Sequence, residues 1–203
     1  FLRTMPHLRG RTNTFNAVFR VRSAAADAIH RYFQEKGFTY VNTPLITGSD
    51  CEGAGEMFQV TTTGFTDKYK SEEEYWADDF FGKKAGLSVS GQLEGEVAAM
   101  AFGKIYTFGP SFRAENSNTP RHVAEFWHVE PEIAFAELPD VIETAEDMIK
   151  TVIGDILKKC PDEIKFFDDH FEKGLTEKLT NLISNEFGRV TYTEAVEMLK
   201  NSG

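Results

Sequence analysis

The residues best suited to chemistry lie in one stretch of this 203-residue chain, between Ile105 and Phe135. Its composition predicts two strands, Ile105–Glu115 and His122–Phe135, joined by a polar turn. Because side chains alternate along a strand, one face of this hairpin can hold arginines, a histidine, an aromatic ring and carboxylates. Such a face suits a nucleotide, since guanidinium groups bind phosphate, a ring stacks on a base and a carboxylate accepts from an amine. The same residue types also occur as inert cross-strand ion pairs on exposed hairpins.

The order of the residues along the hairpin is more specific than their types. It reads Phe-Arg-Ala-Glu at 112–115, then a turn, then Arg121-His122 followed by Glu125-Phe126. This string resembles motif 2 of the class II aminoacyl-tRNA synthetases, and within them the aspartyl, asparaginyl and lysyl subgroup. We therefore expect a member of that family rather than an inert hairpin.

The resemblance implies an ATP site on this hairpin. Arg113 would be the catalytic residue that clamps the α-phosphate, while Glu115 would accept from the adenine amine and Phe126 would stack on the ring. Arg121 and His122 would reach the outer phosphates. ATP is thus expected as a substrate, accompanied by Mg²⁺ whose main ligands lie outside this chain, and no metal ligand is assigned here.

The resemblance also implies an amino-acid site, built around the segment Leu87–Gly103. A short strand leads through Gly91 into a helix, on which residues four apart lie on one face. The residues implied to bind the amino acid are Glu52, Ser90, Gln92, Glu96 and Glu130. Pro131 cannot donate to a strand ladder, so a bulge is expected there that could re-aim Glu130.

Two positions on this helix bear on the choice of substrate. The aspartyl enzymes carry a lysine where this chain has Gly95, and Glu96 follows. A carboxylate at 96 can accept from the amide of asparagine and would repel the carboxylate of aspartate. A buried charge mismatch of that kind is expected to reject the wrong ligand strongly. The sequence therefore predicts activation of asparagine and its transfer to tRNA(Asn), unless Glu96 is an ordinary exposed helix glutamate.

Other functions stay open from the sequence. The nearest is an aspartyl enzyme of the same subgroup, which Gly95 disfavours. A paralogue that forms asparagine by amidating aspartate is another. A third, from a different class, is a non-catalytic dimerisation or binding module.

The fold class expected from the resemblance is α+β: a class II catalytic domain with an antiparallel sheet flanked by helices, its C-terminal part missing. Residues 1–14 would be a linker from an absent anticodon-binding domain, and residues 15–203 a partial catalytic domain with motifs 1 and 2. The third motif, Gly-x-Gly-x-Gly-x-x-Arg, does not occur. A helix capped by Asn13 or Thr14 and ended by Gly37 leads into a strand and Pro44. It resembles motif 1, which implies a homodimer.

The remaining elements are expected to be structural cover. The predicted segments are a short helix in Ser71–Phe81 within the insertion Thr61–Gly86, a helix over Leu138–Lys159, a helical stretch over Phe166–Asn185 broken at Gly174, a strand over Arg189–Tyr192, and a last helix with capping-box spacing from Thr191 to Glu194.

Composition sets limits on the partners. The chain is 41% hydrophobic and 27% charged, with a formal net charge of −10 that argues against non-specific nucleic-acid binding. Cys51 and Cys160 are far apart and have no metal-ligand spacing, as expected of reduced cytosolic thiols. No membrane span or signal peptide is evident, so a cytoplasmic location is predicted.

Overall fold

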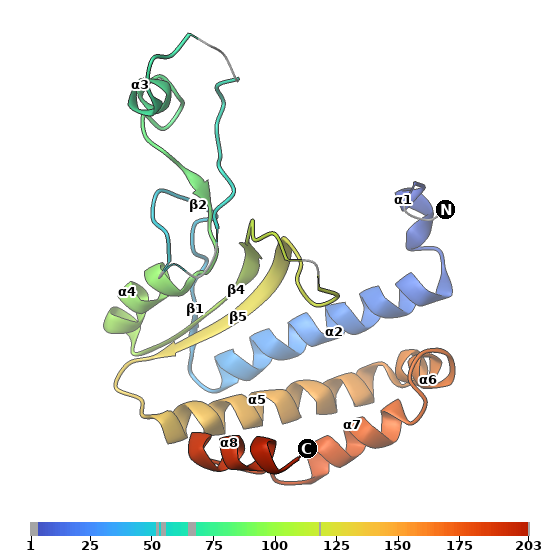
Figure 1. The fold of residues 1–203 in the computed structure, drawn as a ribbon. Helices are drawn as coiled ribbons and strands as arrows, with labels where there is room; N and C mark the ends of the chain where they lie inside the picture. The colour runs from blue at the N-terminus through green and yellow to red at the C-terminus, as the bar shows by residue number, and fades with distance from the viewer. Residues whose placement is uncertain (1–3, 52, 54–55, 65–67, 118, 203) are drawn as a thin grey trace. The chain divides into compact units, whose positions relative to one another are not determined.

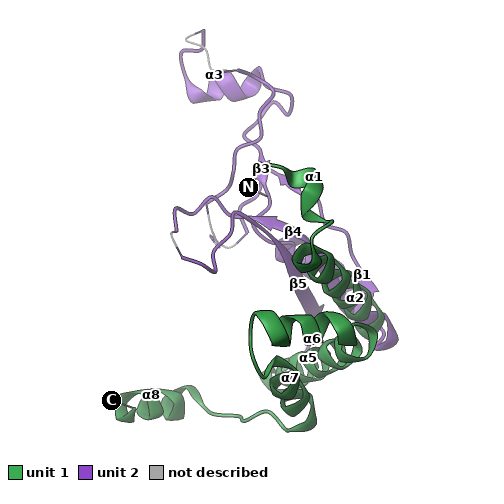
Figure 2. Cartoon of the chain, turned by 90° about the vertical axis from the view of Figure 1, so that its right-hand side faces the viewer, with its two compact units in different colours: residues 1–32, 137–203 green, residues 33–136 purple. Residues whose placement is uncertain are grey.

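The structure is a computed structural model that describes residues 4–51, 53, 56–64, 68–117 and 119–202. Helices and strands are both present (Figure 1), which confirms the predicted α+β class. The chain divides into two compact units, residues 33–136 and residues 1–32 with 137–203 (Figure 2). Each unit is described separately, and the residues of the candidate site fall in the unit 33–136.

Two small sheets organise the unit 33–136. In the first, β4 pairs with both β1 and β5, and the second joins β2 to β3. The β4–β5 pairing is antiparallel as predicted, whereas β1 runs parallel to β4. The elements are β1 (Thr39–Tyr40), β2 (Ile46–Thr47), α3 (Glu72–Ala77), β3 (Gly86–Leu87), α4 (Gln92–Phe102), β4 (Lys104–Phe112) and β5 (Glu125–Ile133).

The β4–β5 hairpin is shorter than the sequence predicted. Both strands were expected to extend closer to the turn, but β4 ends at Phe112 and β5 begins at Glu125. Past Phe112, the N–H of Arg113 still donates to the carbonyl of Ala124 at 3.0 Å, while the N–H of Ala114, on the opposite edge, donates to the carbonyl of Glu56 at 2.7 Å. This crossing contact holds the predicted site residues after Phe112 in a loop beside the strand end.

The predicted bulge at Pro131 is wrong. Pairing is one-to-one along the whole hairpin, with Tyr106 opposite Pro131 and Thr107 opposite Glu130. A proline fits because β5 pairs with β4 alone within the described part of the chain, so no ladder partner needs its missing N–H. Glu130 is therefore directed by the ordinary alternation of the strand.

One face of the hairpin packs into an aromatic core. Tyr106 is fully buried and stacks on Phe33 with ring centroids 4.6 Å apart. Phe38 meets Phe33 edge-on at 5.1 Å, and Gln34 Nε2 donates to the Tyr106 hydroxyl at 3.4 Å. Burial raises the pKa of Tyr106, so its hydroxyl remains a neutral partner for Gln34.

Helix α4 packs on the opposite face, where the polar residues of the hairpin lie. Its buried residues are Gly95 and Ala99. A Cβ built on Gly95 would lie 3.4 Å from the side chain of Ile105 and 3.5 Å from that of Glu132. The small residues let α4 approach the strands closely, which places its N-terminus beside the polar face.

The predicted insertion forms an arm from 61 to 85 that contains α3. The helix is shorter than predicted and is capped by Ser71, whose hydroxyl accepts from the N–H of Glu74. Asp79 is 7% exposed and its Oδ1 accepts from the N–H and hydroxyl of Thr62 and from the N–H of Phe80. These hydrogen bonds, led by that of the Thr62 hydroxyl, hold the pKa of Asp79 far below its ordinary value.

Asp79→Asn is expected to loosen the arm at neutral pH. A carboxylate with a depressed pKa contributes its stability in full above its ordinary value of 3.8 and loses it as the pH falls through the folded-state pKa. Hydrogen exchange by mass spectrometry should therefore show faster exchange of the arm in the variant at pH 7, with a gap that closes below about pH 4. Glu74→Gln, which removes an exposed carboxylate from the same arm, is the control. A gap that stayed constant with pH would show that the charge of Asp79 does not hold the arm.

The other unit is helical throughout its named elements. These are α1 (Pro6–Arg9), α2 (Asn13–Glu35, of which residues up to Tyr32 belong here), α5 (Leu138–Lys159), α6 (Pro161–His170), α7 (Leu175–Ser184) and α8 (Tyr192–Asn201). Figure 1 shows α5 lying between α2 and α7. Tyr32 donates to the carbonyl of Thr144 at 3.1 Å, and Lys159 pairs with Asp27 at 2.6 Å.

Three details of this unit bear on the sequence predictions. The cap of α2 is Thr12, whose hydroxyl accepts from the N–H of Phe15 at 3.4 Å, rather than Asn13 or Thr14. The strand predicted over 189–192 is wrong, because that backbone is irregular until Thr191 begins α8 with the predicted capping box. Glu146 holds the irregular segment by accepting from the N–H of Phe187 at 3.3 Å.

The two cysteines are buried free thiols, as expected of packing residues. Burial raises the pKa of Cys160. Among the helices of the described residues, none has both the length and the apolar character needed to cross a membrane.

Candidate active site

The loop after β4 and the start of β5 enclose a cavity of about 430 Å³. Pockets of this size accommodate nucleotide-sized ligands. Every residue that the sequence placed in the ATP site contributes to its wall. The lining residues are Arg113, Glu115, Ser117, Arg121, His122, Val123, Ala124 and Phe126.

Arg113 is fixed at the inner side of this cavity. Its Nε donates to the carbonyl of Val89 at 3.4 Å, and its guanidinium carbon lies 5.4 Å from the centre of the Phe126 ring. The terminal nitrogens of the guanidinium have no hydrogen-bond partner in the part of the chain that the structure describes. An arginine has five N–H donors, so four remain to bind an anion such as a phosphate.

The other nitrogen-bearing side chains of the cavity lie on its outer rim. Arg121 and His122 are exposed, as is Glu115. The Thr119 hydroxyl contacts Nδ1 of His122, and the His122 N–H donates to the carbonyl of Thr119 at 3.4 Å. The turn therefore holds His122 at the rim, where a flexible anionic group could reach it.

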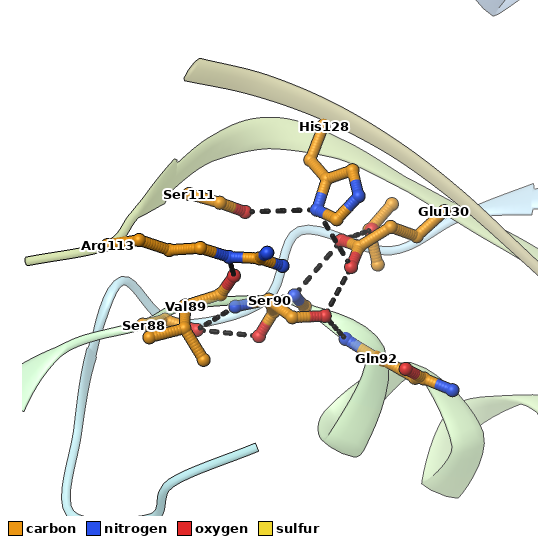
Figure 3. A network of polar contacts seen from close by, with 10 residues as sticks. Ser88, Val89, Ser90, Gln92, Ser111, Arg113, His128 and Glu130 are labelled. Atoms are coloured by element: carbon orange, nitrogen blue, oxygen red, sulfur yellow. Dashed lines mark hydrogen bonds and ion pairs between the residues drawn. The ribbon is translucent and has the colours of Figure 1, made fainter. Parts of the chain in front are cut away.

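Next to Arg113 lies a polar cluster centred on Glu130 (Figure 3), whose carboxylate accepts from three groups, one on β4 and two in the turn before α4. Oε2 accepts from the Thr107 hydroxyl on β4 at 2.9 Å and from the N–H of Gly91 at 3.0 Å. Oε1 accepts from the Ser90 hydroxyl. The side chain is 11% exposed and His128 Nδ1 lies 3.1 Å from Oε1. Glu130 thus ties β4 and β5 to the turn that begins α4.

That turn presents the predicted amino-acid-binding residues. Ser90 is buried, and its hydroxyl oxygen also accepts from the N–H of Gln92 at 3.1 Å. The Gln92 side chain donates to Glu96 Oε1 at 3.3 Å, which confirms that these two residues share a helical face. The carboxylate of Glu130 lies at the start of α4, where the N–H groups of a helix N-terminus favour a negative charge.

Glu96 is exposed in this structure. The sequence argument invoked a buried charge mismatch, and the present surroundings of Glu96 supply no such burial. Water screens an exposed carboxylate, so in these surroundings Glu96 repels a second carboxylate only weakly. Glu52, the remaining residue of the predicted amino-acid site, lies outside the described residues.

Two members of the cluster were missed by sequence reasoning. Thr107 pairs with Glu130 across the hairpin, and Ser111 Oγ lies 3.4 Å from Nδ1 of His128. Both lie on the polar face of β4 by simple alternation. The strand register would have identified them, but the register depends on where the ladder stops, which the sequence did not show.

The glycine at position 91 is a steric requirement of this cluster. Its backbone is right-handed, with φ −85°, so alanine is permitted conformationally. A Cβ there would lie 2.7 Å from Thr43 Oγ1 and 3.2 Å from Glu130 Oε2. The position thus has no space for a side chain.

Gly91→Ala in the full-length protein is expected to displace Glu130 and destabilise the fold by about 1–3 kcal/mol, the usual cost of overpacking. Denaturant unfolding would measure this loss. Gly95→Ala is the matched control on the same helix, because its Cβ would approach no atom closer than 3.4 Å. Equal stability of the two variants would contradict the steric role of Gly91.

No metal site is formed by these residues. Within the described ranges, no group of three or more His, Cys, Asp and Glu side chains is placed to hold an ion. The carboxylate of Glu130 is already occupied by hydrogen-bond donors. The described residues are therefore suited to binding anions and an amino acid rather than to holding Mg²⁺ by themselves.

Arg113 therefore lies between a cavity of about 430 Å³ and a polar turn, with donors left to bind an anion. A sequence model of the family "tRNA synthetases class II (D, K and N)" matches residues 2–203. The chain belongs to this family.

Particular relatives narrow the comparison. The chain is 58% identical over 205 aligned positions to the asparagine–tRNA ligase of Clostridium kluyveri, and equally so to that of Clostridium acetobutylicum. Each alignment covers all of this chain and 44% of the relative, so the chain spans less than half the length of these proteins. The crystal structure of asparaginyl-tRNA synthetase from Pyrococcus horikoshii with asparaginyl-adenylate is similar over the whole chain and 41% of that protein, with a TM-score of 0.81 and 30% identity.

Proposed function

We propose that the protein to which this chain belongs is an asparagine–tRNA ligase. It would activate asparagine with ATP and transfer the asparaginyl group to tRNA(Asn). In the first step, a carboxylate oxygen of asparagine attacks the α-phosphorus, forming the acyl–phosphate bond as the bond to the β-phosphate oxygen breaks. Pyrophosphate leaves with that electron pair. No protein nucleophile is needed, so catalysis would depend on positioning and charge stabilisation.

The observation that supports this proposal is the position of Arg113 between two sites. Its Nε–H is held by the carbonyl of Val89, directly before the turn that carries Ser90. Its guanidinium also faces Phe126 in the wall of the cavity. An α-phosphate bound by the free Nη groups would lie between a nucleotide on Phe126 and an amino acid at Ser90, as adenylate formation requires.

The cavity residues suit the rest of ATP. Phe126 offers a ring for the adenine base to stack on, and Glu115 a carboxylate that can accept from its amine. Arg121 and His122, at the rim, are suited to the outer phosphates. Mg²⁺ would accompany ATP and neutralise phosphate charge, and we assign none of the described residues as its ligands.

The turn and α4 would bind asparagine. The α-ammonium group would be attracted by Glu130 and Gln92, together with Glu52. Because the lone pairs of Glu130 already accept from several donors, its main contribution would be charge and the placement of Ser90 and Gln92. The side-chain amide of asparagine could donate to Glu96, which aspartate could not do.

The wider partners follow from the same proposal. A homodimer through the motif 1 region, residues 15–44, tRNA(Asn) as the acceptor and a cytoplasmic location all fit an asparagine–tRNA ligase. Residues 1–14 would link to an anticodon-binding domain.

Amino-acid-dependent ATP–pyrophosphate exchange by the full-length protein tests the proposal. We expect exchange with asparagine and not with aspartate. The 203-residue chain, run alongside, is expected to be inactive because the third motif is absent from it. Exchange with aspartate alone would support the aspartyl alternative. No exchange with either amino acid would support a binding function.

A further inference from the structure

His128 has no part in the reaction as proposed above, yet its ring touches the central carboxylate of the amino-acid site. Nδ1 lies 3.1 Å from Glu130 Oε1 and 3.4 Å from Ser111 Oγ. The ring is tilted against Phe126 with centroids 5.4 Å apart. Figure 3 shows His128 and Ser111 on the strand side of Glu130, and Ser90 and Gln92 on the helix side.

The partners of Nδ1 determine which ring nitrogen carries a proton. An ionised carboxylate only accepts hydrogen bonds, so an unprotonated Nδ1 would direct a lone pair at Oε1 over this short distance. A protonated Nδ1 donates to Oε1 instead. The tautomer with the proton on Nδ1 is therefore the one that this site selects, and Nε2 is the nitrogen left without a described partner.

A proton on Nδ1 of His128 would complete the environment of Glu130. Oε2 accepts from Gly91 and Thr107, and Oε1 accepts from Ser90 and lies 3.1 Å from Nδ1 of His128. Without the imidazole, one oxygen would lose a donor on the strand side, and the carboxylate could rotate about its side chain. Because Ser90 in turn accepts from the N–H of Gln92, such a rotation would move the first residues of α4.

We infer that His128 is a positioning residue for amino-acid binding, acting through Nδ1–H on Glu130. This inference rests on the proposed function and adds to it a residue that determines the KM for asparagine. A role through Glu130 predicts an unchanged KM for ATP, whereas a role through the contact between the His128 ring and Phe126 would raise the KM for ATP.

Three variants of the full-length protein separate this role from packing. His128→Asn keeps a donor at the position of Nδ1, His128→Gln places its amide where Nε2 lies, and His128→Leu keeps the volume without a donor. We expect the Leu and Gln variants to raise the KM for asparagine about tenfold, and the Asn variant to stay within about twofold of wild type. The KM for ATP should be unchanged in all three.

Steady-state pyrophosphate exchange gives these values, with thermal unfolding as a check on the fold. If the Leu variant does not fold, the Asn and Gln pair still decides, because both are polar. An Asn variant as impaired as Gln would overturn the inference, as would a parallel rise in both KM values. If the wild-type protein exchanged pyrophosphate only with an amino acid other than asparagine, the proposed function would be refuted but the role of His128 would not. The same variants would then test His128 with that amino acid.

Discussion

Arg113→Ala in the full-length protein is expected to lower asparagine-dependent pyrophosphate exchange by about 10³-fold or more, the scale of losing preorganised charge stabilisation at a reacting phosphate. The guanidinium is anchored at Val89 and has free donors facing the cavity. It can therefore meet the charge that develops on the α-phosphate without reorganising. The loss should fall mainly on kcat, because the interaction is strongest in the transition state.

Two control variants sharpen this test. Arg113→Lys keeps the charge but loses the planar fork and the anchor at Nε, so an intermediate rate is expected. Arg121→Ala removes an exposed arginine from the rim of the same cavity and should mainly raise the KM for ATP. An Arg113→Ala enzyme with unchanged kcat would remove Arg113 from the catalytic role.

The second large effect concerns the choice of amino acid. Gly95→Lys combined with Glu96→Gln is expected to lower the preference for asparagine over aspartate by about 100-fold, because a cation replaces a carboxylate near the substrate side chain. Gly95 is buried, and a Cβ there would lie 3.4 Å from the side chain of Ile105. The longer lysine therefore requires local repacking, and thermal unfolding of the double variant is the check that it folds.

The ratio of kcat/KM values for the two amino acids measures this preference. Gly95→Ala, which adds the Cβ without the charge, is the control for packing, and Glu96→Gln alone separates the loss of repulsion from the gain of a cation. If the double variant kept its full preference for asparagine, neither position would select the substrate.

The sequence predicted the polar face of the hairpin because strand alternation is a local property. Phe126 and Glu130 follow from counting residues along β5, and the cavity contains each residue assigned to ATP. The strand ends could not be predicted in this way. Around the end of β4 the backbone bonds to Ser88 and Glu56, and contacts between segments this distant in the sequence are not visible in a local pattern.

Two errors in the sequence analysis have a common cause. The bulge expected at Pro131 ignored that an edge strand has no need of that N–H, and edge position is a property of the sheet. The desolvation expected at Glu96 ignored that α4 turns this residue outward, since Gly95 and Ala99 take the buried face. In both cases the residue type indicated the chemistry. The surroundings of the residue, in contrast, depend on packing between segments that are distant in the sequence.

The arm that carries α3 and Asp79 has a narrow, well-defined attachment. Its two ends are joined by backbone hydrogen bonds of 2.9 Å, from Val60 to the carbonyl of Ala85 and from Leu87 to that of Phe58. Chain ends held this close can be connected by a short turn. The arm is therefore a natural place to exchange a segment, and a reporter peptide grafted between Val60 and Ala85 would leave the backbone of the hairpin and of α4 uninterrupted.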